Sequence, residues 1–170
     1  MSRPFVAILM GSESDLPVMQ GASDVLGILG VQCEMKITSA HRTPAATQQY
    51  ISDAEARGCG VFIAGAGLAA HLAGAVAAHT LKPVIGVPID SGPMQGMDSL
   101  LSTVQMPAGI PVATVGVGNS KNAGLLAARI LGASDPAVAA KVGALMESAR
   151  VASLEKGKTL NAKRNTRTGF

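Results

Sequence analysis

Five short apolar runs recur along the chain, and each is followed by a segment with the apolar spacing of a helix. The runs are bounded by Gly, Pro or Ser and lack the alternation of apolar and polar residues that marks a half-exposed strand. Strands without alternation are buried on both faces, as happens when helices cover both sides of a parallel sheet. The sequence therefore predicts an α/β fold with a doubly wound parallel sheet, its five strands at 5–10, 32–38, 61–64, 83–88 and 111–116.

Capping residues mark where the intervening helices begin and end. The dipeptide Thr43-Pro44 is a typical helix opening, and Gly30 and Gly58 are typical helix ends. Further helices are expected at 15–29, 44–57, 69–79, 98–105, 122–131 and from 135 onward. We expect residues 1–134 to form the catalytic part, and residues 135–170 to add a C-terminal helix and a basic tail to the same single domain.

The composition is that of a globular protein with an aliphatic core. Hydrophobic residues make up 48% of the 170 residues and charged residues 15%, while aromatic residues reach only 2%. Single-stranded nucleic acid needs aromatic faces for base stacking, so we expect no nucleic acid partner. The net charge of +3 comes from residues 151–170, which hold five basic residues and one acidic residue. We interpret this tail as a solvated end, with contact to an acidic surface as the alternative.

Nothing in the sequence indicates export, a membrane span or a metal site. Cys33 and Cys59 form neither a disulfide framework nor a metal-ligand spacing. The N-terminus lacks the pattern of a signal peptide. The uncharged stretch 58–81 is long enough to cross a bilayer, but it divides into a strand-like part and a Gly- and Ala-rich helical part. We therefore expect a cytoplasmic protein without membrane contact.

Three loops draw attention as a candidate site. Parallel open sheets bind ligands beyond the carboxyl ends of their strands, where the strand order reverses. In a flavodoxin-like order the first strand lies between the second and third, so the loops that follow these strands converge. They are GSESD at 11–15, SAHRTP at 39–44 and GAGLAAH at 65–71.

The first two loops carry complementary polar groups. A glycine with neighbouring serines can cradle an anion, and Asp15 can accept hydrogen bonds from a sugar diol, although Ser14 or Asp15 can equally serve as a helix cap. Arg42 can grip a phosphate or carboxylate. The adjacent His41 can move a proton near neutral pH, although an isolated histidine is more often structural.

The third loop resembles a dinucleotide fingerprint. Gly65-x-Gly67-x-x-Ala70 follows a strand, and Asp90 comes twenty residues later. No second nucleotide-binding half follows, however, so the alternative is that the glycines allow close packing near a ligand. The chain contains no Gly-x-Ser-x-Gly motif, no metal-ligand cluster and no Gly-x-x-x-x-Gly-Lys loop.

Taken together, the motifs resemble those of the class I N5-carboxyaminoimidazole ribonucleotide mutases of bacterial purine synthesis. The resemblance covers residues 5–132 and includes GSESD, SAHRTP, AGAGLAAHLAG, KPVIGVPIDSGPMQGMDSLLSTVQMPAGIPVATV and NAGLLAARIL. It implies a flavodoxin-like fold, a homo-octamer, and transfer of a carboxylate from the exocyclic nitrogen of an aminoimidazole ribonucleotide to ring carbon C4. It implies no cofactor, metal, ATP or biotin.

The resemblance also assigns roles to individual residues. His41 matches the catalytic histidine, which shuttles the proton between the carbamate nitrogen and C4. Ser12, Asp15 and Arg42 match substrate-binding positions, and Ser39 matches a phosphate contact. The loop over the imidazole and its carboxylate corresponds to Ala66, Gly67 and His71.

Two residues depart from the family pattern, which has glycine at the position of Leu68 and proline at the position of Ala73. Both substitutions affect the geometry of the third loop. The arginine after the histidine in SAHR resembles class I, since class II carboxylases usually have lysine there. The alternatives are a class II-like carboxylase that uses free carbon dioxide, a non-catalytic nucleotide-binding module and a dinucleotide-dependent oxidoreductase.

The last helix carries an apolar stripe, formed by Val138, Val142, Leu145, Met146 and Ala149. The stripe can pack against the chain's own sheet, or it can form a subunit contact. The resemblance to octameric enzymes favours the subunit contact.

Overall fold

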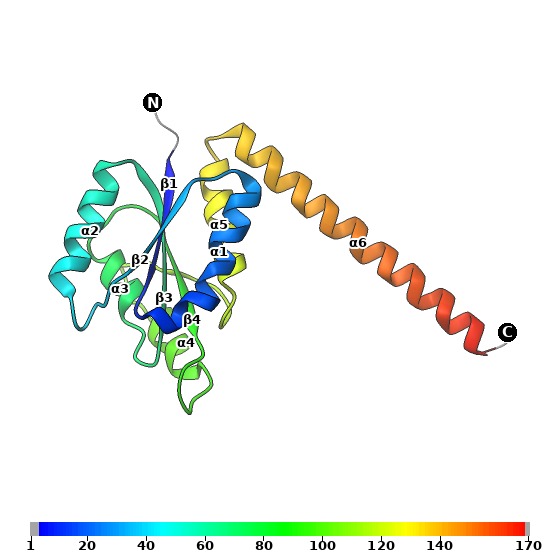
Figure 1. Ribbon diagram of the computed structural model, residues 1–170, viewed down its shortest axis with the longest axis horizontal. Helices are drawn as coiled ribbons and strands as arrows, with labels where there is room; N and C mark the ends of the chain where they lie inside the picture. The colour runs from blue at the N-terminus through cyan, green and yellow to red at the C-terminus, as the bar shows by residue number, and fades with distance from the viewer. Residues whose placement is uncertain (1–3, 169–170) are drawn as a thin grey trace.

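A computed structural model describes residues 4–168, with side chains up to residue 160. The N-terminal residues 1–3 and the side chains of tail residues Lys163, Arg164 and Arg167 lie outside the described part. The chain forms one five-stranded parallel sheet in the order β2-β1-β3-β4-β5, with helices on both faces (Figure 1). The strands are β1 Phe5–Met10, β2 Cys33–Ile37, β3 Cys59–Gly67, β4 Val84–Ile89 and β5 Ala113–Thr114. The predicted doubly wound, flavodoxin-like fold is confirmed.

The helices divide into two layers. One layer consists of α1 Leu16–Leu29 and α5 Ser120–Gly132, joined by the start of α6 Pro136–Thr168. The other layer contains α2 Pro44–Ala56, α3 Leu72–Ala77 and α4 Met97–Val104. A short 3-10 helix, η1 Glu13–Asp15, precedes α1.

The two layers explain why the strands read as continuous apolar runs. In β1, Ile8 and Met10 belong to the core under α1 and α5, whereas Ala7 and Leu9 belong to the core under α2 and α3. All four side chains are buried. Alternate side chains of a strand point to opposite faces, so both faces demand apolar residues here.

Several predicted boundaries shift. The last strand is only two residues long, and α3 begins at Leu72 because β3 continues to Gly67. Gly65 and Gly67 therefore lie inside β3, paired with Val87 and Ile89 of β4, and not in a turn that opens a helix. The dinucleotide-like pattern consequently lacks the strand-to-helix turn that would hold a pyrophosphate.

The final helix, α6, projects from the body of the molecule over most of its length (Figure 1). Only its beginning is packed: Val138 and Val142 are buried in the core under α5, and Leu145 is partly buried beside them. Met146 and Ala149 are exposed. The apolar stripe is therefore only partly buried: its first two residues pack against the body of the same chain, and its last two are exposed. Among the described residues, no helix is long and apolar enough to span a membrane.

Candidate active site

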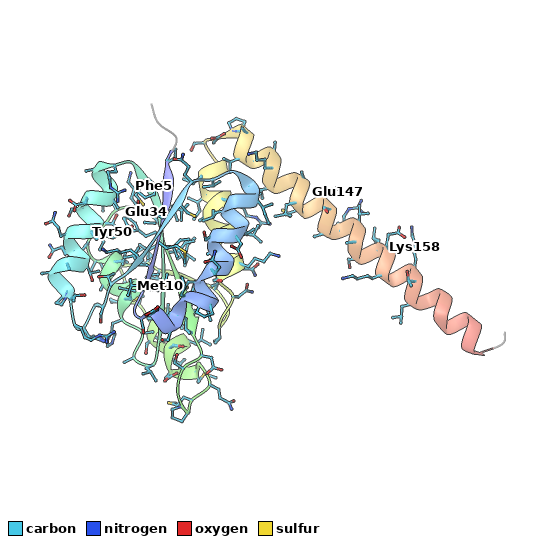
Figure 2. All side chains as sticks on the ribbon, viewed as in Figure 1. Phe5, Met10, Glu34, Tyr50, Glu147 and Lys158 are labelled. Atoms are coloured by element: carbon cyan, nitrogen blue, oxygen red, sulfur yellow. The ribbon has the colours of Figure 1, made fainter. Side chains whose placement is uncertain are left out.

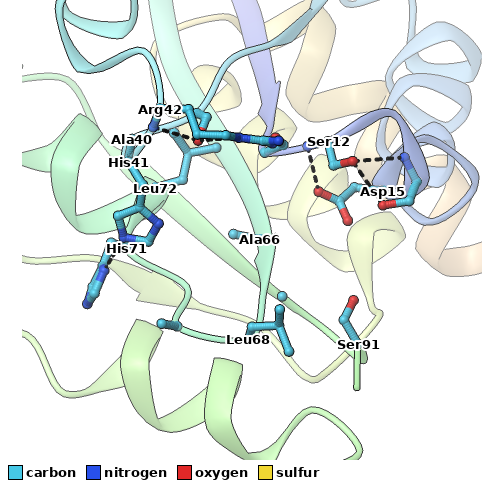
Figure 3. Close-up of a pocket in the computed structure, with 15 residues that line it drawn as sticks. Ser12, Asp15, Ala40, His41, Arg42, Ala66, Leu68, His71, Leu72 and Ser91 are labelled. Atoms are coloured by element: carbon cyan, nitrogen blue, oxygen red, sulfur yellow. Dashed lines mark hydrogen bonds between the residues drawn. The ribbon is translucent and has the colours of Figure 1, made fainter.

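A cavity of about 530 Å³ opens at the carboxyl ends of β1, β2 and β3 (Figure 3). The three loops that the sequence predicts as the candidate site form its walls, as the predicted strand order requires. All eight residues predicted for the site line it, namely Ser12, Asp15, Ser39, His41, Arg42, Ala66, Gly67 and His71.

The first loop is held by a capping box. Ser12 N donates to Asp15 Oδ2 at 3.0 Å, and Ser14 N donates to Ser12 Oγ at 3.4 Å. The capping side chain is therefore Ser12, on η1, and neither Ser14 nor Asp15 caps α1 with its side chain. Asp15 is only 5% exposed. Burial raises the pKa of its carboxyl, and hydrogen bonds from the Ser12 and Gly11 backbone N–H groups act in the opposite direction.

The second loop is a closed turn. Ser39 N donates to Thr43 Oγ1 at 3.1 Å, and Thr43 N donates back to Ser39 O at 2.9 Å. Inside the turn, Arg42 N donates to Ser39 Oγ at 3.1 Å. Thr43 precedes α2 as predicted, but its hydroxyl belongs to the turn and does not cap the helix. These bonds fix the backbone of the turn that carries His41.

Arg42 joins the first two loops. Its Nη2 donates to Gly11 O at 3.0 Å, and its Nε lies 3.4 Å from Ser39 Oγ. A guanidinium has five N–H donors, so these two contacts leave donors for a bound anion. The positive charge consequently lies over the rim that holds Ser12 and Ser39, and this rim suits a phosphate.

The two histidines of the cavity contact each other. His41 Nε2 and His71 Nδ1 are 2.5 Å apart, and the ring planes are nearly perpendicular, at 88°. Two ring nitrogens at this distance need one proton between them, with one ring as donor and the other as acceptor. The fold thus brings together, from residues 30 positions apart, a pair of groups able to hold and release one proton.

The third loop carries backbone strain. Leu68 has φ +54°, the left-handed region, at the position where the resembled family has glycine. Such a conformation costs an ordinary L-residue about 1–2 kcal/mol. Ala73, the other departure, is buried in the first turn of α3, where a proline would also be tolerated.

One polar residue of the cavity lies outside the three predicted loops, namely Ser91, which follows β4. A Cβ built on Gly67 would lie 2.5 Å from Ser91 Oγ, so the glycine allows this close approach. The signal was available, because β4 lies beside β3 in the predicted order and its loop ends at the same edge. Gly11 and Ser14 of the first loop and the apolar residues Ala40, Leu68, Ala69 and Leu72 complete the wall.

The site therefore combines hydrogen-bond donors that can bind an anion, a carboxylate that can accept hydrogen bonds, and a pair of histidines that can hold a proton. Within the part of the chain that the structure describes, no three His, Cys, Asp or Glu side chains gather as metal ligands. Arg42 and the serines provide donors, Asp15 provides a buried acceptor, and His41 with His71 holds a proton. This arrangement can bind an anionic molecule that carries hydroxyls and can move a proton on it.

Comparisons with known proteins point to one family. Residues 5–151 match the family model described as AIR carboxylase. Over 158 residues the chain is 54% identical to the N5-carboxyaminoimidazole ribonucleotide mutase of Pyrococcus horikoshii, a match covering 93% of this chain and 89% of the relative. The mutase of Thermotoga maritima is 53% identical, with 92% of each chain covered. The crystal structure of PurE from Treponema denticola superimposes with a TM-score of 0.86 at 33% identity, covering 93% of this chain and 99% of that chain.

Proposed function

The chain belongs to the AIR carboxylase family, and we propose that it is a mutase that converts N5-carboxyaminoimidazole ribonucleotide to 4-carboxy-5-aminoimidazole ribonucleotide in purine biosynthesis. The observation that carries the proposal is the His41–His71 contact inside a cavity lined by Arg42 and Asp15. The identities of 53–54% to proteins named as this mutase support it.

The substrate's polar groups match the two ends of this cavity. The phosphate is a dianion, and it pairs with Arg42 and with the hydroxyl of Ser39. The ribose diol donates to the carboxylate of Asp15, with Ser12 beside it. These contacts leave the aminoimidazole ring at the third loop, next to both histidines.

The reaction requires one proton to travel in each direction. The bond between the exocyclic nitrogen and the carboxylate carbon breaks, carbon dioxide is released inside the cavity, and His41 gives its proton to the nitrogen. Ring carbon C4 then forms a bond to the carbon dioxide, and its proton passes to His41. No proton is consumed overall, and His71, which contacts His41 Nε2, shares the proton that His41 moves.

The direct test supplies purified protein with either of two substrates in the presence of EDTA and without ATP. The proposal expects the carbamate to be converted to the C4 carboxylate at full rate after chelation. Conversion of aminoimidazole ribonucleotide with bicarbonate, and not of the carbamate, would instead identify a carboxylase. Loss of activity on chelation that a specific metal restores would contradict the mechanism.

We further propose that the protein is cytoplasmic and assembles as a homo-octamer through the projecting part of α6. Val151 and Leu154 are exposed on that part, 44% and 52% respectively, three residues apart on the helix. Replacing both by lysine is expected to reduce the particle mass measured by light scattering, whereas the control Ser153→Lys is expected to leave it unchanged. Val142 is unsuitable for this test, because it is buried in the subunit's own core. A monomeric wild-type protein at micromolar concentration would refute the assembly.

A further inference from the structure

Leu68 has a backbone conformation that is unfavourable for its residue type. Among the described residues that line the cavity, it is the only non-glycine residue with positive φ. A glycine would adopt φ +54° without steric conflict. Strained conformations persist where the surroundings impose them, and they cluster at binding sites. The leucine side chain therefore needs a role that a glycine could not fill.

One side of this side chain holds the loop after β4. A Cβ built on Gly92 would lie 2.8 Å from Leu68 Cδ2, so the Gly92 backbone packs directly against the leucine. Gly67 makes the equivalent close approach to Ser91. Two consecutive residues of the third loop thus contact two consecutive residues at the end of β4.

The ends of the same loop are fixed independently. Ser99 is buried, and its Oγ donates to Ile89 O at 2.9 Å and to Gly96 O at 3.0 Å. These bonds hold the residues on either side of segment 90–95. Between these ends, Ser91 packs against Gly67 and Gly92 packs against Leu68, and these contacts place the Ser91 hydroxyl at the rim of the cavity.

The other side of Leu68 faces open space. The side chain is 53% exposed although it lines the cavity. Figure 3 shows Leu68 and Ser91 across the cavity from Arg42 and Ser12. The donors and acceptors for phosphate and diol are on the Arg42 side, so the least polar part of a bound nucleotide lies toward Leu68.

We propose that Leu68 is a specificity-determining residue whose exposed methyl groups pack against the aminoimidazole ring. This proposal rests on the proposed function, which supplies the ring. The leucine acts twice: it fills the space over the ring, and it packs against Gly92, the residue after Ser91. Burying about half of a leucine side chain on a ring corresponds to roughly a tenfold change in affinity.

The test measures affinity by calorimetry for two probes, 4-carboxy-5-aminoimidazole ribonucleotide and ribose 5-phosphate. Leu68→Gly and Leu68→Asn both tolerate positive φ but lack the methyl groups. Both are expected to bind the ribonucleotide about tenfold more weakly, with ribose 5-phosphate binding within about twofold of wild type. Leu68→Met keeps the apolar bulk and is expected to retain ribonucleotide affinity.

Two outcomes would overturn the proposal. The first is a Leu68→Gly variant that binds the ribonucleotide as tightly as the wild type. The second is an equal loss for both probes, which would mean that Leu68 only maintains loop structure. Both readouts are affinities, so failure of the wild type to convert the carbamate would contradict the proposed function alone. A wild-type protein that binds no ribonucleotide would contradict both.

Discussion

The two ends of the sheet use the same kinds of side chain in opposite ways. At the amino end, Glu34 accepts from Tyr50 Oη at 2.6 Å and from Arg57 Nη1 at 2.7 Å, and the Arg57 guanidinium lies over the Phe5 ring at 5.2 Å. Figure 2 shows Phe5, Glu34 and Tyr50 near one end of the sheet and Met10 at the other. Every charge in this cluster has a partner within the chain.

At the carboxyl end, residues of the chain itself supply only some of the hydrogen-bond partners that the charged groups can take. Arg42 makes two hydrogen bonds to the loops and has further N–H donors that a ligand can use. Asp15 is buried beside the open cavity. The pKa directions agree with this contrast. Hydrogen bonding to Arg57 lowers the pKa of Glu34, whereas burial raises the pKa of Asp15. The amino end stabilises the fold, and we propose that a ligand supplies the remaining partners of the charged groups at the carboxyl end.

The largest effect is expected at His41. Replacement by asparagine removes the proton shuttle while preserving a hydrogen-bonding side chain, so turnover falls about 10²–10⁴-fold or more. The melting temperature is expected to change little, because the side chain is exposed. His79→Asn is the control, since the His79 ring hydrogen-bonds the Ala75 carbonyl and His79 does not line the cavity. A His41→Asn enzyme that keeps more than about a tenth of wild-type activity would remove His41 from the mechanism.

A smaller effect is expected at Asp15. Asp15→Asn keeps an acceptor for Ser12 N but loses the negative charge toward the ribose diol, so ribonucleotide affinity falls about 10–100-fold. The folded-state pKa of Asp15 is raised, so its contribution to stability is present below the unfolded pKa and lost as pH rises through the folded value. The variant is therefore expected to be at least as stable as wild type at pH 7. Calorimetric binding and thermal unfolding check the two effects, and a clearly destabilised variant would contradict the assignment.

At the amino end the expected pattern is reversed. Glu34→Gln is expected to leave turnover unchanged and to lower the free energy of unfolding at pH 7 by about 1 kcal/mol, because solvent screens this half-exposed network. The pKa of Glu34 is lowered, so its contribution is present above the unfolded pKa and lost as pH falls through the folded value. Urea unfolding at pH 7 and below pH 4 measures this loss. Glu147→Gln, which breaks only an exposed pair with Arg150, is the control. A pH-independent difference would argue against the ionic contact.

The smallest effect is expected at Ala73. Proline at this position in the first turn of α3 would restrict the unfolded chain without removing a helical hydrogen bond, and would stabilise the protein by about 0.4–1 kcal/mol. Turnover is expected to stay within about twofold of wild type, because Ala73 is buried away from the cavity lining. Urea unfolding and a rate assay together check this. Destabilisation would show that the backbone at Ala73 does not accept the proline angle.

The apolar runs predicted a parallel sheet of five strands, and the flavodoxin-like order that the family resemblance implies predicted the convergence of three loops. The sequence did not predict that Ser12, and not Ser14 or Asp15, provides the cap, since several adjacent residues can all cap a helix. The sequence likewise could not predict the contact between His41 and His71. That contact depends on side-chain rotamers across two loops, for which a linear pattern holds no information.

The length of the packed part of α6 could not be predicted from the sequence either. The residues from Val138 to Ala149 repeat with helical spacing, but only the first two are buried against the body. Periodicity shows which side of a helix is apolar, and it does not show where the neighbouring surface ends. Ser91 was not predicted because the candidate site comprised only the loops after the first three strands, whereas the cavity extends to the loop after β4.

The proposed mutase reaction requires that the carboxylate stays within one site at the carboxyl end of the sheet while His41 moves the proton. The most direct measurement follows ¹³C placed in the carbamate carboxylate while the enzyme turns over in unlabelled bicarbonate. The C4 carboxylate of the product is expected to retain the label, because the carbon dioxide is captured before it leaves the cavity. A product that carries unlabelled carbon from the medium would contradict the claim and identify an enzyme that uses free carbon dioxide.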